Sequence, residues 1–467
     1  MIESNAGECL KALRGRLIEG GENHPFRGVS IDSRTLRAGQ LFFCIRGPRF
    51  DGHDFIADAM QKNAAGIILS DAARLPAARQ EKDRPFVIGV TDPLAALQAL
   101  ARFHRERLSV RVVGVTGTNG KTTTKEMIAT LSETKFKTLK TRGNLNNHIG
   151  LPLNVLELEP GHEVAILEMG MSAAGEIKRL AEIARPEIGV ITNISEGHLV
   201  KLKNLKNVQA AKGELFEALG SGGTAIVNAD DPLVLELAQS LRSRKITFGI
   251  HNPADVRAAG IQQQANNGFD FTVHLFDRKF RGRLPFPGFC NIYNALAAVA
   301  AGHSLGLEPE SMAAGMGHYR LLSQRYEILR HQSMTIINDS YNANPQSMRE
   351  ALATLSQYQV PGRRFLVIGD MLELGDLSES AHTRLGAEIA KHSVDVLVTV
   401  GELAALAARA ARAGGMDAQR ALALDTREEA AHYLRKTART GDCLLFKGSR
   451  GAGMEMIIQE LIQPEVP

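Results

Sequence analysis

Residues 111–124 read RVVGVTGTNGKTTT, and this stretch decides the fold of the middle of the chain. RVVGVT has the apolar character of a buried strand, TGTNG is a glycine-rich turn, and KTTT opens a segment with helical spacing. Glycines let the backbone approach phosphates closely, and the amides at a helix N-terminus present positive potential to an anion. The stretch therefore predicts a phosphate loop made of Gly117, Thr118, Asn119, Gly120, Lys121, Thr122 and Thr123.

The loop departs from the common pattern GxxxxGK[ST], because Val115 stands where that pattern has its first glycine. The shorter spacing GxxGKT is kept from Gly117 to Thr122. A purely structural glycine turn is the alternative, but GKT at the start of a helix favours a nucleoside triphosphate, with ATP as the expected ligand. We expect Lys121 to reach the outer phosphates and the Thr122 hydroxyl to ligate Mg²⁺.

Strands and helices alternate outward from this loop. EVAILEMG, EIGVITNI and TAIVNAD predict further strands of a parallel sheet covered on both faces, and residues 255–286 predict hairpins. After residue 318, MTIIND, RFLVIGD, VDVLVTV and CLLFKGS predict a second doubly wound sheet. The predicted fold class is α/β with three domains: a smaller N-terminal α/β domain (1–108), a central parallel-sheet domain with the phosphate loop (109–318) and a C-terminal Rossmann-like domain (319–467).

The composition excludes several classes of protein. With 467 residues, 44% hydrophobic and 23% charged, the chain is long enough for about three globular domains and is neither mainly disordered nor a coiled coil. The net charge of +4 gives no argument for nucleic acid as a partner. The longest apolar run, residues 295–301, is too short for membrane insertion. No signal-peptide core follows Met1, and the four scattered cysteines suit reduced thiols, so we expect a cytoplasmic protein.

Two side chains at predicted strand ends suggest a metal site. Glu168 ends the strand EVAILE, and His198 follows the strand in ITNISEGHL. Both are expected at the carboxyl edge of the parallel sheet beside the phosphate loop, although a helix-capping glutamate and an ordinary lone histidine are the alternatives. Lys212 lies fourteen residues after His198 in a predicted helix, where pattern alone indicates a solvated lysine.

Seven stretches, in this order, resemble the Mur ligase family of ATP-dependent amide-bond synthetases. They are TGTNGKTTT (116–124), GNLNNHIGLP (143–152), LEMGMS (167–172), TNISEGHL (192–199), AAKGELF (210–216), CNIYNALAA (290–298) and INDSYNANPQSM (337–348). Within the family, DSYNANP, GDMLELG (369–375) and KGSRG (447–451) resemble the branch that adds D-alanyl-D-alanine to UDP-N-acetylmuramoyl-tripeptide, and the DNPR motif of the diamino-acid-adding branch is absent. The family's three domains bind the UDP substrate, bind ATP, and complete the site with a Rossmann-like fold.

The resemblance implies a role for each matching residue. Lys121, Lys212 and His198 become the catalytic set, with Lys121 on the transferring phosphate. Thr122 and Glu168 would ligate one Mg²⁺, and His198 and a carbamylated Lys212 a second. Further nucleotide contacts are implied at Asn147, Asn291, Asn294, Arg325 and Asp339.

The substrate contacts implied by the resemblance have structural alternatives. Ser30, Asp32, Ser33 and Arg34 match the segment that holds the uridine end, but they also read as a polar turn. Tyr341, Asn342 and Asn344 fall near the expected dipeptide, but Asn-Pro is also a common way to start a helix.

The implied reaction passes through an acyl phosphate in peptidoglycan precursor synthesis, in a monomer whose C-terminal domain closes about a hinge near residues 318–325. Three alternatives stay open at this point: another amide ligase such as the diamino-acid-adding enzyme or a folylpolyglutamate synthetase, a P-loop switch or transport ATPase, and a nucleotide-binding regulator without catalysis. The sequence does not distinguish lysine from meso-diaminopimelate as the third residue of the tripeptide.

Overall fold

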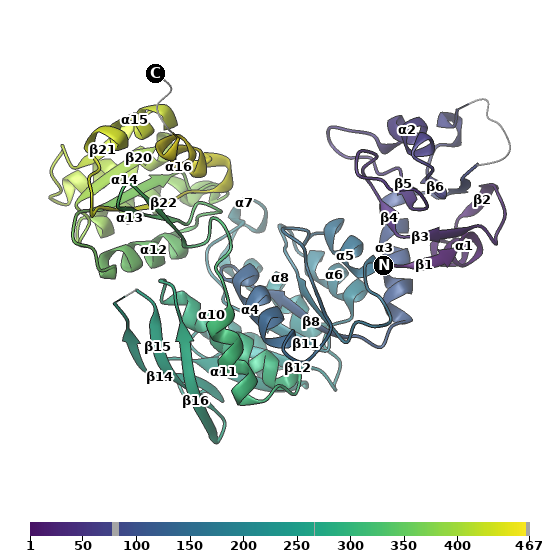
Figure 1. Cartoon of the computed structure of the whole chain (residues 1–467), viewed down its shortest axis with the longest axis horizontal. Coiled ribbons are helices and arrows are strands. Elements are labelled where there is room, and N and C mark those ends of the chain that lie inside the picture. Colours follow the sequence, from purple (N-terminus) through teal and green to yellow (C-terminus); the bar gives the residue numbers. More distant parts are fainter. Residues whose placement is uncertain (77–83, 266, 464–467) are drawn as a thin grey trace.

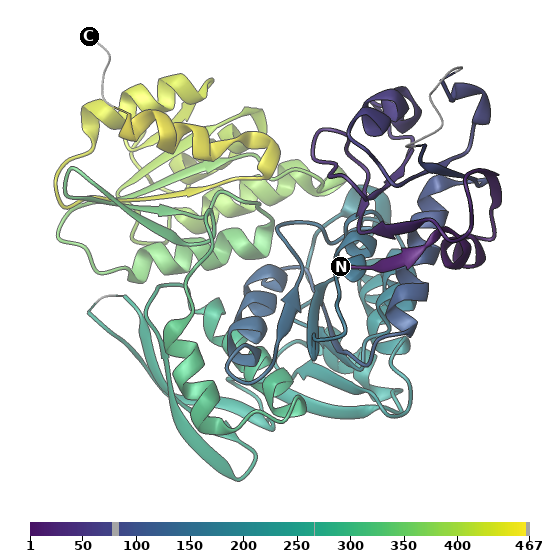
Figure 2. The same ribbon diagram turned by 45° about the vertical axis from the view of Figure 1, so that its right-hand side comes forward.

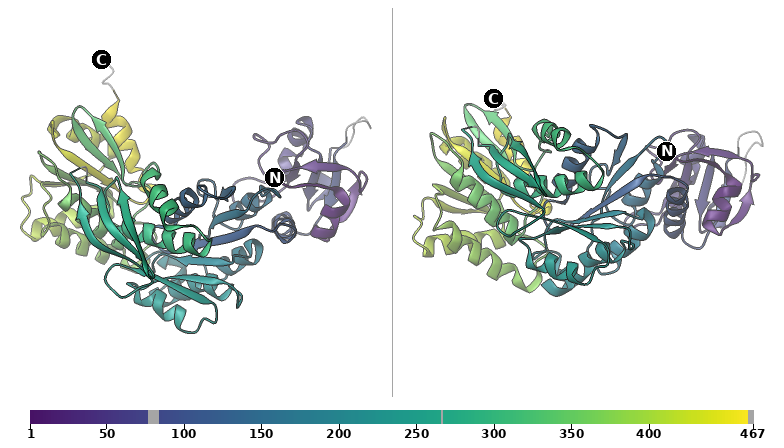
Figure 3. Two further views of the ribbon diagram at one scale, coloured as in Figure 1. Left: turned by 60° about the horizontal axis from the view of Figure 1, so that its bottom comes forward. Right: turned by 90° about the horizontal axis from the view of Figure 1, so that it is seen from below.

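The computed structural model of the chain describes residues 1–76, 84–265 and 267–463. Three large β-sheets with flanking helices follow one another along this part of the chain. The N-terminal unit lies on one side of the central unit and the C-terminal unit on the other, in every view (Figures 1, 2 and 3). The α/β class and three-unit architecture expected from the alternation of strands and helices are confirmed. The boundaries at residues 108 and 318 stay a prediction.

The N-terminal unit contains a five-stranded sheet in the order β2-β7-β6-β5-β4, parallel except for β2. Helix α3 leads out of it: the Asp92 side chain accepts a hydrogen bond from the Leu94 amide and Pro93 opens the helix, a favoured N-terminal arrangement. Because α3 also packs on α5 and α6, it ties this unit to the central one. The elements of the N-terminal unit are β1 (Glu3–Asn5), α1 (Ala6–Leu13), β2 (Arg16–Glu19), β3 (Pro25–Arg27), β4 (Val29–Ser30), β5 (Leu41–Phe43), α2 (Ile56–Gln61), β6 (Gly66–Leu69), β7 (Phe86–Gly89) and α3 (Pro93–Glu106).

The central unit is built on a nine-stranded sheet in the order β16-β15-β14-β13-β12-β11-β8-β10-β9. Strands β8 to β14 pair in parallel and are covered by helices, whereas β14, β15 and β16 form the predicted antiparallel hairpins. The elements are β8 (Arg111–Thr116), α4 (Lys121–Ser132), β9 (Thr138–Lys140), α5 (Gly150–Leu156), β10 (Val164–Glu168), α6 (Glu176–Ala184), β11 (Ile188–Ile191), α7 (Leu199–Leu202), α8 (Leu205–Glu217), β12 (Thr224–Asn228), α9 (Pro232–Gln239), β13 (Arg244–Gly249), β14 (Val256–Gln263), β15 (Phe269–Leu275), β16 (Arg278–Leu284), α10 (Cys290–Ser304) and α11 (Pro309–His318).

The C-terminal unit is a six-stranded sheet in the order β17-β18-β22-β19-β20-β21, parallel except for the edge strand β17. The four predicted strands are its buried middle strands, while β17 and β21 at the two edges were not predicted. The elements are β17 (Glu327–His331), β18 (Met334–Asn338), α12 (Pro345–Gln357), β19 (Arg364–Gly369), α13 (Ser378–Ile389), β20 (Val396–Val400), α14 (Glu402–Ala413), β21 (Ala421–Leu424), α15 (Arg427–Thr437), β22 (Cys443–Lys447) and α16 (Met454–Ile462).

The central sheet gathers the predicted site at one edge. Strand β8 lies between β10 and β11, and its last residues pair with the ends of both: Val115 with Glu168, and Thr116 with Ile191. The loops that leave these three strands therefore emerge side by side at the carboxyl edge, where ligands bind in open parallel sheets. Within the described residues, no helix has both the length and the apolar character needed to cross a bilayer.

Candidate active site

The carboxyl edge of the central sheet and the C-terminal unit enclose a cavity of about 400 Å³. It brings together most of the residues predicted from the sequence, although they are spread over more than two hundred positions. Those that line it are Thr118, Asn119, Gly120, Lys121, Thr122, Thr123, Asn147, Glu168, His198, Lys212, Asn291, Asn294, Arg325, Asp339, Tyr341, Asn342 and Asn344.

The glycines of the loop are required by its backbone and by its neighbours. Gly117 has φ 147° and Gly120 has φ 80°, in the region that L side chains rarely adopt. A Cβ at Gly117 would overlap the Thr192 hydroxyl, and one at Gly120 would overlap the Asn294 carboxamide. The loop can therefore take this tight course, directly into helix α4, only with glycine at both positions.

Two lysines converge on one carbonyl of the loop. Lys121 Nζ donates to the Gly117 carbonyl at 2.8 Å and to the Thr118 carbonyl at 3.0 Å, and Lys212 Nζ donates to the same Gly117 carbonyl at 2.9 Å. Burial, and then the nearby Lys121, lower the pKa of Lys212 well below its usual value. Burial also lowers the pKa of Lys121, although Glu168 opposes this shift. Lys212 is thus a buried amine and not the solvated helix lysine that its pattern suggested.

Glu168, at the end of β10, presents an unpaired carboxylate oxygen. Its Oε1 accepts a hydrogen bond from Asn146 Nδ2 at 2.7 Å, whereas Oε2 is buried and has no hydrogen-bond partner among the described residues. A buried acceptor without a partner is costly, so this oxygen suits a donor or a cation. Across residues 1–76, 84–265 and 267–463, however, no three His, Cys, Asp or Glu side chains gather in a ready-made metal cluster.

His198 lies on the other side of the loop and is held by the C-terminal unit. Its Nδ1 is 2.8 Å from Glu373 Oε2. Burial lowers the pKa of the imidazole, the neighbouring Lys121 lowers it further, and Glu373 opposes the shift. Because Nδ1 is bound to the Glu373 carboxylate, the other ring nitrogen, Nε2, is the one available to ligate a metal ion.

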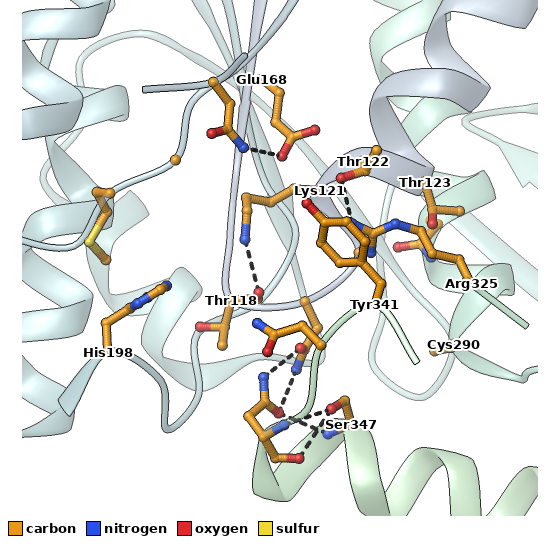
Figure 4. Close-up of a pocket in the computed structure, with 18 of the residues that line it drawn as sticks. Thr118, Lys121, Thr122, Thr123, Glu168, His198, Cys290, Arg325, Tyr341 and Ser347 are labelled. Atoms are coloured by element: carbon orange, nitrogen blue, oxygen red, sulfur yellow. Dashed lines mark hydrogen bonds between the residues drawn. The ribbon is translucent and has the colours of Figure 1, made fainter. Parts of the chain in front are cut away.

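Two more polar contacts cross from the C-terminal unit to the phosphate loop. Arg325 Nη2 donates to the Thr122 hydroxyl at 3.0 Å, and its guanidinium lies 4.0 Å from the centre of the Tyr341 ring (Figure 4). Asn344 Nδ2 donates to Asn119 Oδ1 at 2.7 Å, and Asn119 Nδ2 donates back to Asn344 Oδ1 at 3.3 Å. The loop is thus bound to the C-terminal unit on two sides.

The predicted phosphate or ribose contact Asp339 is engaged by a lysine. Lys447 Nζ donates to Asp339 Oδ2 at 2.6 Å and to the Asn342 carbonyl at 3.0 Å. Burial raises the pKa of Asp339, and the ammonium group of Lys447 opposes that shift. The pair places one more buried cation at the wall of the cavity.

The predicted adenine-side asparagines form a hydrogen-bonded chain. Asn294 accepts from the Thr124 hydroxyl at 3.1 Å and donates to Asn291 at 3.2 Å, and Asn291 donates to the Pro287 carbonyl at 3.0 Å. Asn147 accepts from two backbone amides at the start of α5. These contacts fix local structure, so any role in binding would come in addition to it.

A second, larger cavity of about 720 Å³ adjoins the first. It shares Asn119, Gly120 and Asn294 with the first cavity and is also lined by Phe289 and Tyr293. Its walls therefore combine the back of the phosphate loop with aromatic side chains, which suits the flat, partly apolar part of a nucleotide.

The N-terminal candidates lie outside the main cavity. Among the described residues, Ser30 and Asp32 line a separate cavity of about 180 Å³ beside Leu145, and Ser33 and Arg34 line neither. Asp32 forms an ion pair with Arg34 at 2.7 Å, and the Ser30 hydroxyl donates to the Asp32 carbonyl. The segment therefore makes the internal hydrogen bonds of a polar turn, and its role in binding the uridine end stays a prediction.

Several residues of the cavity wall were not predicted from the sequence to have a role in the site. Asn146 and His148 belong to GNLNNHIGLP, and Lys447 belongs to KGSRG. Ser172 ends the LEMGMS stretch, and Glu176 lies four residues after it. The motifs were visible in the sequence, but nothing in their spacing indicated which member faces the cavity.

Comparison with known proteins fits this architecture. The family models that match are the Mur ligase family catalytic domain (residues 25–105), the Mur ligase middle domain (115–302) and the Mur ligase glutamate ligase domain (324–450). The UDP-N-acetylmuramoyl-tripeptide–D-alanyl-D-alanine ligase of Bacillus subtilis is 38% identical over 465 residues, which cover 99% of each chain. The chain belongs to the Mur ligase family.

Other relatives of this Mur ligase agree in length. The ligase of the same name from Escherichia coli is 34% identical over 99% of both chains. A crystal structure of MurF from Acinetobacter baumannii superposes with a TM-score of 0.89 at 30% identity, covering 99% of this chain and 100% of that one. MurF from Thermotoga maritima, solved in complex with ADP, gives a TM-score of 0.81 at 27% identity and covers 93% of this Mur ligase and 97% of its own chain.

Proposed function

We propose that this Mur ligase joins D-alanyl-D-alanine to UDP-N-acetylmuramoyl-tripeptide, coupled to ATP, in the synthesis of peptidoglycan precursors. The observation that carries the proposal is the cavity in which the phosphate loop meets Arg325 and Asn344 of the C-terminal unit. A carboxylate is a poor acyl donor, so amide formation needs a site that holds ATP and two further substrates together. The full-length similarity to ligases of that name supports the same substrates.

ATP is proposed to lie across both cavities. Its phosphates would replace the loop carbonyls as partners of Lys121, and the amides at the start of α4 would bind the phosphate oxygens. The adenosine part would occupy the adjoining cavity beside Asn291 and Asn294, with Asn147 as a weaker contact. Arg325 would release Thr122 and contact the nucleotide instead. Asp339, paired with Lys447, would contact the ribose or the phosphates.

The donor set fits Mg²⁺. Glu168 Oε2 is an unpaired buried anion, and the Thr122 hydroxyl lines the same cavity. Because Mg²⁺ is usually held by one or two carboxylates together with substrate phosphates, a ready-made protein cluster is not needed. Thr122 and Glu168 would hold one ion, and His198 with Lys212 would serve a second. When bound, the ions would neutralise phosphate charge.

Lys212 is proposed to carry a carbamate. Burial lowers the pKa of Lys212, so its nitrogen loses its proton more readily than an exposed lysine does; the free amine can then attack CO₂, forming a C–N bond and releasing one proton. The product is an anionic oxygen ligand, and it would be attracted to the ammonium group of Lys121. A carbamate would thus account for the burial of Lys212 beside Lys121.

The reaction follows from this placement. The tripeptide's terminal carboxylate attacks the γ-phosphate of ATP in line, giving an acyl phosphate and ADP. The amine of D-alanyl-D-alanine then attacks the acyl carbon, and phosphate leaves from the tetrahedral intermediate. Lys121 and the loop amides stabilise the negative charge that spreads over the transferring group. The C-terminal unit, docked through Asn344, excludes water from the acyl phosphate.

The remaining substrate contacts are proposed from their positions. Ser30, Asp32, Ser33 and Arg34 would hold the uridine end on the N-terminal unit, and Tyr341, Asn342 and Asn344 would contact the dipeptide on the C-terminal side. We propose that the protein acts as a monomer. A cytoplasmic reaction is consistent with four free cysteines and with the supply of ATP there.

The test is a coupled phosphate-release assay with UDP-N-acetylmuramoyl-tripeptide, ATP and Mg²⁺, with and without D-alanyl-D-alanine. Phosphate release that depends on the dipeptide supports the proposal. Turnover that ignores the dipeptide would favour a switch or transport ATPase. Turnover that requires a diamino acid or glutamate instead would assign another ligase of the family.

A further inference from the structure

The loop of residues 370–375, within the GDMLELG stretch, connects the C-terminal sheet to the central site. It follows β19 and is fixed from inside the C-terminal unit. The Met371 amide donates to His382 Nε2 at 2.9 Å, and the Leu372 amide donates to Ser449 Oγ at 2.8 Å. His382 is completely buried, and Ser449 belongs to the KGSRG stretch. Helix α13 and the KGSRG stretch thus hold this loop in one conformation.

Glu373, in this loop, contacts the central unit twice. Its side chain lies 2.8 Å from His198 Nδ1, and its main-chain carbonyl accepts a hydrogen bond from the Leu199 amide at 3.1 Å. Both partners have left-handed backbones, with φ 64° at Glu373 and φ 56° at His198. Non-glycine residues keep such conformations only where their surroundings impose them, and they concentrate at functional sites.

The contact determines which ring nitrogen of His198 carries the proton. A carboxylate accepts but does not donate, so a neutral imidazole beside Glu373 must carry its proton on Nδ1. Nε2 then has a free lone pair. Histidines that ligate metals usually donate the other ring N–H to a carboxylate or carbonyl, which fixes both the tautomer and the ring orientation.

We propose that Glu373 is a positioning residue that sets the tautomer and orientation of His198 from the C-terminal unit. The proposal rests on the proposed function for the role of His198 as a ligand, but not for the tautomer itself. Glu373 lies in the C-terminal unit and His198 in the central unit. The imidazole ring therefore has the required tautomer and orientation only when the two units are docked. Docking would thereby be coupled to completion of the site.

The first measurement reads the tautomer without metal or nucleotide. Histidine-labelled protein would be studied by long-range ¹H–¹⁵N NMR at a pH where His198 is neutral, with a His198→Gln variant to assign the signal. We expect the Nδ1–H form to predominate in the wild type, and Glu373→Ala to shift the signal toward the Nε2–H form. Asp376→Asn, which changes an exposed carboxylate just beyond the loop, should leave the signal unchanged.

The second measurement is the Mg²⁺ concentration that gives half-maximal ligase activity. Loss of such a partner costs about 10–100-fold in metal affinity or activity, so Glu373→Ala should raise this concentration at least about tenfold with little change in KM for the UDP substrate. An unchanged His198 signal in Glu373→Ala, or the same loss in Asp376→Asn, would overturn the proposal. A wild type without ligase activity would refute the proposed function, and the NMR comparison would still decide the role of Glu373.

Discussion

Asn344 performs two tasks that substitutions can separate. Its side chain caps α12 by accepting from the Ser347 amide at 2.9 Å, and it exchanges hydrogen bonds of 2.7 Å and 3.3 Å with Asn119 of the phosphate loop. Asn344→Ser keeps a good helix cap, because serine and asparagine are about equal at that position, but its side chain is too short to replace the carboxamide pair. Asn344→Ala removes both.

The two hydrogen bonds between Asn344 and Asn119 determine how much free energy of docking each variant should lose. Each contributes about 0.5–1.5 kcal/mol net, and the longer one less, so we assign about 1–2 kcal/mol to the pair. That free energy corresponds to roughly a 5- to 30-fold change in the equilibrium constant for docking. Loss of the cap in Asn344→Ala adds about 1 kcal/mol of destabilisation, or roughly 2–4 °C in the unfolding temperature of a domain of this size.

The assay combines kcat/KM for ATP with thermal unfolding. Both variants should lose about 5- to 30-fold in kcat/KM, but only Asn344→Ala should melt at a lower temperature. Adding Asn119→Ala to either variant should cost little more, because the partner is already lost. Wild-type kcat/KM in Asn344→Ser, or fully additive losses with Asn119→Ala, would refute the argument that this pair docks the C-terminal unit.

Three further predictions concern single residues. Lys121→Ala should lower kcat by about 10²–10³ without changing the fold, as measured by phosphate release and circular dichroism, and near-normal turnover would contradict its role. Lys212→Ala should be inactive and partly restored by short carboxylic acids; absence of rescue, with no extra mass on the native lysine, would remove the carbamate. Burial raises the pKa of Asp51, but hydrogen bonds from His53 and Arg46 outweigh this and lower it to about 2. A depressed carboxylate pKa contributes stability that is present above the unfolded pKa of about 4. This stability is lost as the pH falls from about 4 toward the folded pKa of about 2. Urea unfolding between pH 5 and pH 3 should therefore show a smaller loss of stability for Asp51→Asn than for the wild type, and equal losses would count against the ion pair.

The structural features that depend only on residues close together in the sequence could be predicted. A strand, a glycine turn and a helix in fourteen residues identified the phosphate loop, because backbone freedom and helix-start amides are local properties. The buried middle strands of the C-terminal sheet were found by their continuous apolar runs. The edge strand β17, with the sequence EILRH, was missed because it is only partly buried and three of its five residues are polar.

Contacts between distant parts of the chain could not be predicted in the same way. Asn119 and Asn344 are separated by 225 positions, and the pairing of Glu373 with His198 depends on how two sheets dock. The burial of Lys212 is also a tertiary property, since its helix has ordinary small neighbours and only the fold places it against Gly117. Ser30 to Arg34 form a hydrogen-bonded turn outside the main cavity, and their role in binding the uridine end stays a prediction.

In the cavity around Lys121, ATP cleavage is expected to depend on a tripeptide acid and a dipeptide amine. The most direct measurement supplies purified protein with UDP-N-acetylmuramoyl-tripeptide, ATP, Mg²⁺ and D-alanyl-D-alanine, and follows ADP and the nucleotide-linked peptide by mass spectrometry. We expect one ADP for each pentapeptide product and negligible product when the dipeptide is left out. ADP without any lengthened peptide, or neither product, would contradict it.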